Sequence, residues 1–267
     1  MLKVTDLSIT AKDTQKALVN NVSFSLEQGE ILAIIGESGS GKTLTSTSIM
    51  GLLDTSIFNI SGSITYLEQN LLALKEKEMA KFRLKEIAMI YQEPMSSFTP
   101  FLSIGKQIHL ALNHHKKCSK KESYELIAPF LLEVGLGNIE DIFLKYPHEL
   151  SGGQLQRILI ALSLTLSPKI LIADEPTTAL DVYAQQEIME LLKKISIDNN
   201  LSILFISHDL NLVEELADRI IIMKEGQIIE ENDKKNIFKN PKEDYTKKLL
   251  SSRISCLIEE ESVEKYE

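Results

Sequence analysis

The residues best suited to chemistry form one short run, Gly36-Glu37-Ser38-Gly39-Ser40-Gly41-Lys42-Thr43. The apolar run 31–35 before it has the composition of a buried parallel strand, and the pattern of residues 44–53 after it suits a helix. Strand, glycine-rich loop, Lys-Thr and helix are the context in which a G-x-x-x-x-G-K-[ST] match forms a phosphate-binding loop. The alternative, a glycine-rich turn with an incidental Lys-Thr pair, leaves that context unexplained. The sequence therefore predicts a nucleoside triphosphate site.

Each residue type in this loop has a physical reason to be there. The glycines let successive backbone N–H groups turn inward around an anion, and the helix N-terminus adds partial positive charge. Lys42 is expected to reach the β- and γ-phosphates, and the Thr43 hydroxyl to bind Mg²⁺. The predicted nucleotide ligands from this loop are Gly36, Glu37, Ser38, Gly39, Ser40, Gly41, Lys42 and Thr43.

Two carboxylates follow a second apolar run. Residues 169–173 have the pattern of a buried strand, and Asp174 and Glu175 come directly after it. Asp174 suits Mg²⁺ binding, and Glu175 suits general-base work on the water that attacks the γ-phosphate. Acidic pairs at strand ends are often only solvated, but a phosphate loop in the same chain favours the functional interpretation.

Gln92 and His208 also follow apolar strand-like runs, 87–91 and 202–206. Ligands of open α/β sheets bind at the carboxyl ends of strands, so both side chains are candidates for contact with the γ-phosphate. The alternative is that both are ordinary loop residues.

A second helix start, 150–157, also has features of an anion-binding site. Ser151 is a good N-cap, and Gly152 and Gly153 allow close backbone approach before an apolar helix. One nucleotide does not need two such sites in one chain. A dimer, in which each chain supplies one of them to each nucleotide, resolves this.

Composition limits the class of protein. The chain has 267 residues, of which 43% are hydrophobic and 25% charged, as expected of an ordinary soluble protein. The formal net charge of −9 argues against nucleic acid as a partner. Cys118 and Cys256 lie far apart and form no C-x-x-C, which indicates a reduced compartment and no metal cluster. No apolar run is long enough to span a bilayer, and no secretory signal opens the chain.

The remaining elements are predicted from periodicity. Residues 2–10 alternate like an edge strand, 17–26 and 62–67 suit further strands, and together they suggest a small antiparallel β-subdomain. Residues 101–115, 123–134 and 184–195 have helical spacing of apolar positions. A last hairpin is expected at 220–230. Beyond Pro241 the chain turns polar and acidic, so we expect a frayed tail there, ending in Glu259, Glu260, Glu261 and Glu267.

Taken in order, these motifs closely resemble those of the ATP-binding-cassette (ABC) ATPases over roughly residues 1–235. The resemblance implies an α/β fold with a RecA-like P-loop NTPase core, an antiparallel β-subdomain and an inserted helical subdomain at about residues 93–156. It leaves 236–267 as a C-terminal extension. It also implies ATP and Mg²⁺ as cofactors, and a head-to-tail dimer in which the signature of one subunit closes over the phosphate loop of the other.

The resemblance further assigns a role to each motif. Gln92 becomes the Q-loop glutamine, which contacts nucleotide and Mg²⁺ and takes part in catalysis, and Asp174 the Mg²⁺ aspartate. Glu175 becomes the catalytic glutamate and His208 the switch histidine. The D-loop aspartate and the nucleotide-contacting signature residues are Asp181, Ser151, Gly152, Gly153 and Gln154.

Within the family, the chain looks most like the peptide/nickel importer group. The resemblance lies in residues 91–100, in 146–150 and in 241–250, with its Pro-Tyr-Thr-Leu-Leu-like pattern. Two features depart from the family. Residues 11–17 contain no aromatic side chain, where the family usually stacks one on adenine. The cysteine cluster that many peptide-type members carry after residue 250 is missing, because only Cys256 remains.

These resemblances imply an ATPase subunit that powers uptake through a separate membrane permease. Its partners would be a second ABC ATPase subunit, the permease and, indirectly, an extracytoplasmic substrate-binding protein, and its place the cytoplasmic face of the membrane. Alternatives are an exporter subunit, an ABC ATPase acting on DNA or ribosomes, and a kinase. The kinase leaves the Ser151-Gly152-Gly153 signature unexplained, and DNA or ribosome ATPases usually need long insertions or tandem cassettes.

The connector from Gln92 into the helical segment is a candidate permease contact. Met95, Phe98, Phe101 and Leu102 give it apolar surface that a permease helix could cover. The alternative is that these side chains pack inside the helical subdomain. Polar residues at positions 98 and 101 distinguish the two cases, since a coupling role predicts lost transport with unchanged nucleotide binding.

Overall fold

The computed structural model describes residues 1–178 and 180–251, which form two compact units. The first unit combines Met1–Leu72 with the chain from Leu204 onward, and the second is Ala73–Ile203. Strand β8 (Ser202–Ile206) passes from the second unit into the first. The predictions for Cys256 and for the acidic end, Glu259 to Glu267, lie outside the described residues.

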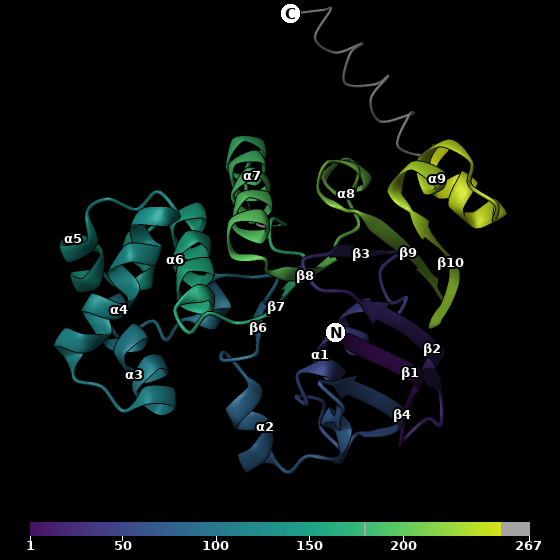
Figure 1. Cartoon of the computed structure of the whole chain (residues 1–267), viewed down its shortest axis with the longest axis horizontal. Helices are drawn as coiled ribbons and strands as arrows, with labels where there is room; N and C mark the ends of the chain where they lie inside the picture. Colours follow the sequence, from purple (N-terminus) through teal and green to yellow (C-terminus); the bar gives the residue numbers. More distant parts are fainter. Residues whose placement is uncertain (179, 252–267) are drawn as a thin grey trace, which may run out of the picture. The chain divides into compact units, whose positions relative to one another are not determined.

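The first unit contains an antiparallel sheet with the order β2-β1-β4-β5. The strands β2, β1 and β4 lie side by side in Figure 1. Its strands are β1 (Leu2–Ala11), β2 (Ala17–Leu26), β4 (Phe58–Tyr66) and β5 (Gln69–Asn70). The predicted β-subdomain is confirmed, but β1 is not an edge strand, because it pairs with β2 on one side and β4 on the other. Alternation reports only which face of a strand is buried and not how many neighbours the strand has.

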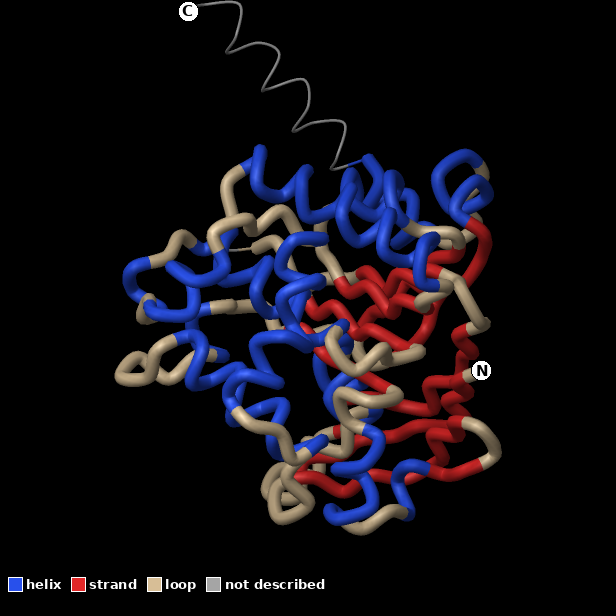
Figure 2. The backbone as a smooth tube through the Cα atoms, turned by 60° about the vertical axis from the view of Figure 1, so that its left-hand side comes forward, coloured by secondary structure: helices blue, strands red, loops and turns tan. Residues whose placement is uncertain are grey.

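A second group of strands in this unit leads to the glycine-rich loop. Strands β3 (Ile31–Ile35) and β9 (Arg219–Lys224) are parallel, and β9 forms the predicted hairpin with β10 (Gln227–Asp233). All five residues of β3 are buried, as expected for a strand in the middle of a parallel arrangement. Figure 2 shows the strands of the chain in red, with the N-terminus beside them. The helices of this unit include α1 (Lys42–Ile49), α8 (Leu210–Leu216) and α9 (Lys234–Lys239), and residues 244–251 are helical as well. The 3₁₀ turn η1 (Leu71–Ala73) lies at the boundary between the two units.

The second unit joins a parallel strand pair to a group of helices. Strands β6 (Ile87–Ile90) and β7 (Ile170–Asp174) are parallel, with Ile90 opposite Ala173. The helices are α2 (Glu76–Phe82), α3 (Ile104–Lys116), α4 (Lys120–Glu133), α5 (Ile139–Leu144), α6 (Gly152–Leu164) and α7 (Val182–Asn199), with the 3₁₀ turns η2 (Met95–Ser97) and η3 (Pro147–Glu149). Helix α4 packs against α3 and α6, and α5 against α3 (Figure 1).

The spacing of apolar residues predicted which segments are helical, but it did not predict the exact ends of the helices. The predicted core faces are buried, with Ile104, Ile108 and Leu112 on α3 and Ile127 and Leu131 on α4. However, α3 begins three residues later than predicted and α4 three residues earlier. The reason for the second shift is a capping box: the Ser119 hydroxyl accepts from the Glu122 N–H while the Glu122 carboxylate accepts from the Ser119 N–H.

The chain beyond Pro241 is not frayed up to residue 251, so that prediction is wrong for this part. Residues 244–251 are helical, and the Thr246 side chain is completely buried. The Glu230 carboxylate on β10 accepts hydrogen bonds from the backbone N–H groups of Lys242 (2.9 Å) and Glu243 (3.1 Å). Polar composition suggested a solvated tail, but one buried carboxylate some ten residues earlier holds the segment in place.

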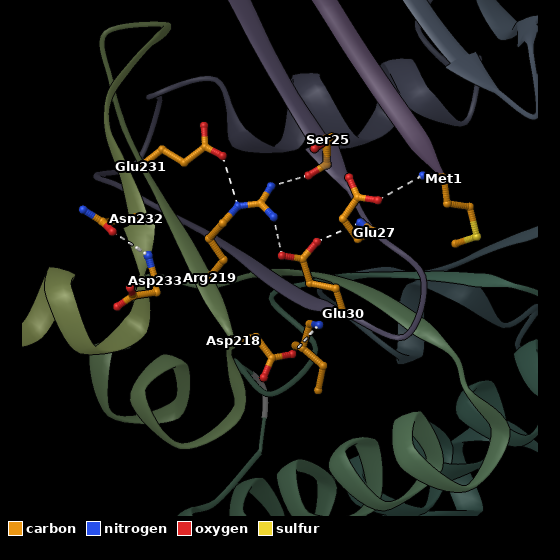
Figure 3. Close-up of polar contacts among 10 residues, drawn as sticks. Met1, Ser25, Glu27, Glu30, Asp218, Arg219, Glu231, Asn232 and Asp233 are labelled. Carbon is orange, nitrogen blue, oxygen red and sulfur yellow. Dashed lines mark hydrogen bonds and ion pairs between the residues drawn. The ribbon is translucent and has the colours of Figure 1, made fainter.

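A cluster of charges centred on Arg219 ties several segments of the first unit together (Figure 3). The Arg219 guanidinium donates to the carboxylates of Glu30 and Glu231 and to the Ser25 carbonyl. These partners belong to β2, to the turn before β3 and to β10. A planar guanidinium with several donors satisfies them all, so the cluster fixes where β3, and therefore the loop after it, begins.

We expect Arg219→Met to lower the free energy of unfolding by about 1–3 kcal/mol, because it leaves the mostly buried Glu30 carboxylate without its cation. Urea denaturation of the purified chain measures this. Lys121→Met is the matched control, since it breaks an exposed pair with Glu125 on one helix and should cost at most about 0.5 kcal/mol. Equal effects of the two substitutions would show that the Arg219 cluster is no more than a surface ion pair.

Candidate functional site

The glycine-rich loop lies in the first unit, between β3 and α1. Gly41 is the N-cap of α1 and has a φ of 100°, a conformation that glycine adopts without strain. A Cβ at Gly36 would lie 2.1 Å from the Met223 carbonyl oxygen and 2.8 Å from Ser40 Oγ, so only glycine fits there. The strand, loop and helix that the motif requires are therefore present, although α1 ends at Ile49 and not at the predicted residue 53.

Two polar side chains make the loop suitable for a phosphate group. Lys42 is only 5% exposed, and its ammonium donates to the carbonyl oxygens of Gly36 (2.8 Å) and Glu37 (3.0 Å). The Ser40 hydroxyl is buried and has no hydrogen-bond partner within the part of the chain that the structure describes. The buried Lys42 ammonium bonds to the backbone of the same loop, and the Ser40 hydroxyl is an unsatisfied hydrogen-bonding group among the described residues. Both features suit an anion bound by this loop.

His208 belongs to the same unit as the loop. It is exposed and follows Ser207, whose N–H donates to the Ile34 carbonyl oxygen of β3 at 3.3 Å. The carboxyl ends of β8 and β3 therefore lie next to each other. His208 follows one strand end and the glycine-rich loop follows the other, which is the arrangement expected of ligand-binding residues in an α/β sheet.

The second unit brings together two of the residues that the sequence singles out. The Gln92 side-chain amide donates to Glu175 Oε2 at 3.1 Å, although the two residues are 83 positions apart. The parallel pairing of β6 with β7 makes this possible, because both strands end at the same edge. The Thr178 hydroxyl donates to the same carboxylate oxygen, also at 3.1 Å. These two bonds orient the Glu175 carboxylate.

Glu175 also has an unusual backbone. Its φ of 48° lies in the left-handed region, which is uncommon for a residue with a side chain and recurs at functional sites. The preceding Asp174 is buried, with 3% of its surface exposed, at the end of β7. Burial raises the pKa of the nearby Tyr91 hydroxyl, and the Asp174 carboxylate adds to that shift, so Tyr91 remains protonated at neutral pH.

The proposed Mg²⁺ site requires only a few protein ligands. No group of three or more His, Cys, Asp or Glu side chains suited to a metal ion occurs among residues 1–178 and 180–251. Mg²⁺, however, typically takes one or two protein oxygens and completes its shell with water and substrate phosphates. The buried Asp174 carboxylate in the second unit is one oxygen donor of that kind, and the Thr43 hydroxyl in the first unit is another.

The signature segment forms the N-terminus of α6. The Ser151 hydroxyl accepts from the Gln154 N–H (3.2 Å), and the Gln154 amide oxygen accepts from the Ser151 N–H (3.0 Å). This is a capping box, and it satisfies two of the backbone donors at the helix start. Gly152 and Gly153 are the first residues of the helix, so their backbone N–H groups belong to its positive end.

In the structure, Asp181 caps a helix. Its carboxylate accepts from the Ala184 N–H at 2.9 Å and caps α7, which therefore begins two residues before the predicted start. The Gln185 amide donates to the carbonyl oxygens of Thr177 (3.1 Å) and Leu180 (3.2 Å). These bonds link the segment after Glu175 to α7.

Sequence reasoning missed Thr178 and Gln185. Thr178 gave no signal, because its partner is another side chain that the turn after β7 brings within reach. Gln185 gave none, since an amide on an exposed helix turn has no distinguishing pattern. Both act on neighbouring groups, and neither is itself placed to do chemistry.

Comparison with known proteins adds independent findings. A family model described as "ABC transporter" matches residues 19–178. The oligopeptide transport ATP-binding protein AppD of Bacillus subtilis is 46% identical over 235 residues, which are 88% of this chain and 72% of that protein. The metal-staphylopine import system ATP-binding protein CntD of Staphylococcus aureus is 40% identical and covers 95% of this chain and 93% of its own.

Solved structures give the same result for the fold. The dimeric post-hydrolysis state of the ATP-binding cassette MJ0796, bound to ADP and Pi, matches with a TM-score of 0.76 at 28% identity, over 87% of this chain and 98% of that one. The cbiO1 structure from Clostridium perfringens, part of an ABC transporter complex, also has a TM-score of 0.76 at 28% identity, over 97% and 98% of the two chains.

Proposed function

This chain belongs to the ABC transporter family and is the ATP-hydrolysing subunit of an importer, and we propose that it powers the uptake of peptides or of nickel or other metal chelates. It has the α/β fold of the family's ATPase cassettes, with a RecA-like core, and it binds ATP. The proposal of cargo follows the relatives, which carry out oligopeptide transport or metal-staphylopine import. The alternative, an exporter or a non-transport system, has no support among the relatives described above.

The nucleotide site in this proposal uses the residues of the motifs. The loop 36–43 holds the phosphates, with Lys42 on the β- and γ-phosphates. Thr43, Asp174 and Gln92 would hold Mg²⁺, which would neutralise phosphate charge when bound. Glu175 takes the proton of the attacking water, with Gln92 beside it. The remaining nucleotide contacts in the proposal come from His208, Asp181, Ser151, Gly152, Gly153 and Gln154.

The observation that carries the catalytic part is the hydrogen bond from the Gln92 amide to Glu175 Oε2, 3.1 Å long. A base must be held by its neighbours if it is to accept a proton from a positioned water. Here an amide donor and the Thr178 hydroxyl both hold Oε2 of the carboxylate that is proposed to accept the proton. Gln92 also directly precedes the connector that begins at Glu93, so its hydrogen bond links the proposed base to that connector.

The proposed assembly has two of these subunits head to tail, with the signature of each against the loop of the other. The neighbour MJ0796 is dimeric, which supports this arrangement. No helix in the part of the chain described by the structure has the length and apolar character to span a membrane. Membrane permease subunits are the proposed partners, with an extracytoplasmic substrate-binding protein delivering cargo to them. The chain would then act at the cytoplasmic face of the membrane.

Deletion of the gene in its host, with uptake of a labelled oligopeptide and of a nickel chelate measured side by side, tests the proposal. Uptake of one of them should be lost and should return with the wild-type gene but not with the Glu175→Gln gene. Unchanged uptake of both compounds would refute the cargo proposal. Loss of uptake that Glu175→Gln also restores would instead refute the catalytic role.

The connector after Gln92 offers a second prediction, because the structure separates its two phenylalanines. Phe98 is 7% exposed and Phe101 86% exposed, so core packing holds for Phe98 while Phe101 remains available to a partner. We expect Phe101→Ala to leave the melting temperature and ATP affinity unchanged but to lower cargo uptake several-fold, because a permease contact loses apolar area.

Phe98→Ala is the matched control and should destabilise the chain by about 3–5 kcal/mol through the cavity it leaves. Thermal unfolding, nucleotide titration and uptake are measured on both variants. Full uptake by the Phe101 variant would remove it from the permease contact, and an equal loss of stability in both variants would show that Phe101 is a packing residue too.

A further inference from the structure

The glycine-rich loop is held from outside by segments that come late in the chain. The Gly226 N–H, in the turn of the β9–β10 hairpin, donates to the Ser40 carbonyl oxygen at 3.0 Å. The Glu37 N–H donates to the Tyr245 hydroxyl at 3.3 Å, across 208 positions of sequence. Both contacts involve loop backbone and lie within the first unit. The first of them comes from the core hairpin, and the second from the segment 241–251.

Tyr245 is itself fixed from two sides. The Lys224 ammonium lies 4.9 Å from the centre of its ring, which is within range of a cation–π contact. Glu230 holds the start of the segment by accepting the N–H groups of Lys242 and Glu243. The next residue after Tyr245, Thr246, is completely buried. The hydroxyl therefore reaches the loop from a segment whose own position is set by packing and hydrogen bonds.

The protonation states suit this arrangement. Burial acts to raise the pKa of the Glu230 carboxyl, but Thr246 and the N–H groups of Lys242 and Glu243 outweigh it and hold the pKa below its usual value. Glu230 is therefore ionised at neutral pH and is a strong acceptor. Burial raises the pKa of Tyr245, so its hydroxyl keeps its proton over the same range.

We propose that the segment 241–251 is a positioning element for the phosphate-binding loop, with Tyr245 as the residue that contacts the loop and Glu230 as its anchor. The inference rests on the proposed function, because it takes 36–43 as the phosphate site. Tyr245 contacts the peptide at which the loop leaves β3, and a loop fixed there is already shaped for its ligand. Preorganisation of this kind improves affinity by lowering the ordering cost of binding.

Tyr245→Phe is the direct test, because it removes one oxygen atom and keeps the ring beside Lys224. In the full-length chain we expect the Kd for ATP, measured without Mg²⁺ to prevent turnover, to rise about threefold to tenfold, as for the loss of one hydrogen bond. The KM for ATP should rise by a similar factor while kcat stays within about twofold, because the hydroxyl does not touch the reacting atoms. The melting temperature of the nucleotide-free chain should fall by no more than about 4 °C, as expected for the loss of one hydrogen bond.

Tyr124→Phe is the matched control, because it makes the same chemical change on α4, far along the chain from the loop. Glu230→Gln tests the anchor, because an amide replaces one of the carboxylate's acceptor oxygens with a donor. It should raise the Kd in the same direction as Tyr245→Phe. The double variant should raise the Kd by less than the product of the two single effects, since both substitutions act through one contact.

An unchanged Kd in Tyr245→Phe overturns the proposal, as does an equal rise in Tyr124→Phe. Effects of Tyr245→Phe and Glu230→Gln that multiply fully would refute the anchoring role of Glu230. A fall in kcat at unchanged KM would contradict a role in binding. If Lys42→Ala leaves the Kd unchanged, it is the phosphate site itself that fails, so the two failures are distinguishable.

Discussion

Replacing Glu175 by glutamine is expected to lower ATP turnover at least about a hundredfold, the typical contribution of a positioned general base. The substitution keeps the size and shape of the side chain. Its amide oxygen still accepts from Gln92 and Thr178, so the geometry of the strand end should be retained. What disappears is the negative oxygen that accepts a proton from water. ATP affinity should therefore stay within about twofold, and nucleotide-bound dimers should accumulate.

Steady-state phosphate release by the complex with its permease, nucleotide titration and size-exclusion chromatography with ATP measure these three quantities. Glu190→Gln, the same change on an exposed position of α7, is the matched control and should hydrolyse ATP normally. Near-normal turnover by Glu175→Gln would mean that another group accepts the proton. A large loss of ATP affinity would mean that the carboxylate shapes the binding site and is not primarily a base.

Local chemistry was the most predictable part of this molecule. The strand, loop and helix around Lys42 follow from apolar runs and glycines that lie within twenty residues of each other, and local patterns of that kind survive in the fold. The strand ends at Gln92 and Glu175 were predicted separately as acidic or polar groups after apolar runs. The hydrogen bond between these two side chains was not predicted. It depends on the pairing of β6 with β7, and four α-helices separate these strands in the sequence.

Long-range contacts explain the errors as well. Strand β1 was taken for an edge because alternation records one buried face, and only the pairing with both β2 and β4 shows its central place. The segment after Pro241 was taken for a frayed tail because its composition is polar. Its order depends on Glu230, whose buried carboxylate would look unremarkable in any window of sequence.

Lys42→Ala is expected to weaken ATP binding by about tenfold to a hundredfold, the effect of losing a hydrogen bond to a charged group. The ammonium is buried in the first unit and is held by the carbonyl oxygens of Gly36 and Glu37. These carbonyl groups hold it over the loop before any phosphate arrives. Alanine removes the positive charge that binds the phosphate oxygens. It also removes the two hydrogen bonds to the carbonyl groups of the loop, so affinity falls for two reasons.

Thermal stability separates these two contributions. Bound nucleotide stabilises a protein by RT ln(1 + [L]/Kd), so the shift in melting temperature with added ATP reports affinity. In Lys42→Ala that shift should nearly vanish at ATP concentrations that stabilise the wild type fully. The melting temperature without ATP reports only the contribution of the hydrogen bonds from Lys42 to the loop. Lys235→Ala, on the exposed side of α9, is the matched control and should keep the full shift. A Lys42→Ala chain with the wild-type shift would show that the loop 36–43 does not hold phosphate.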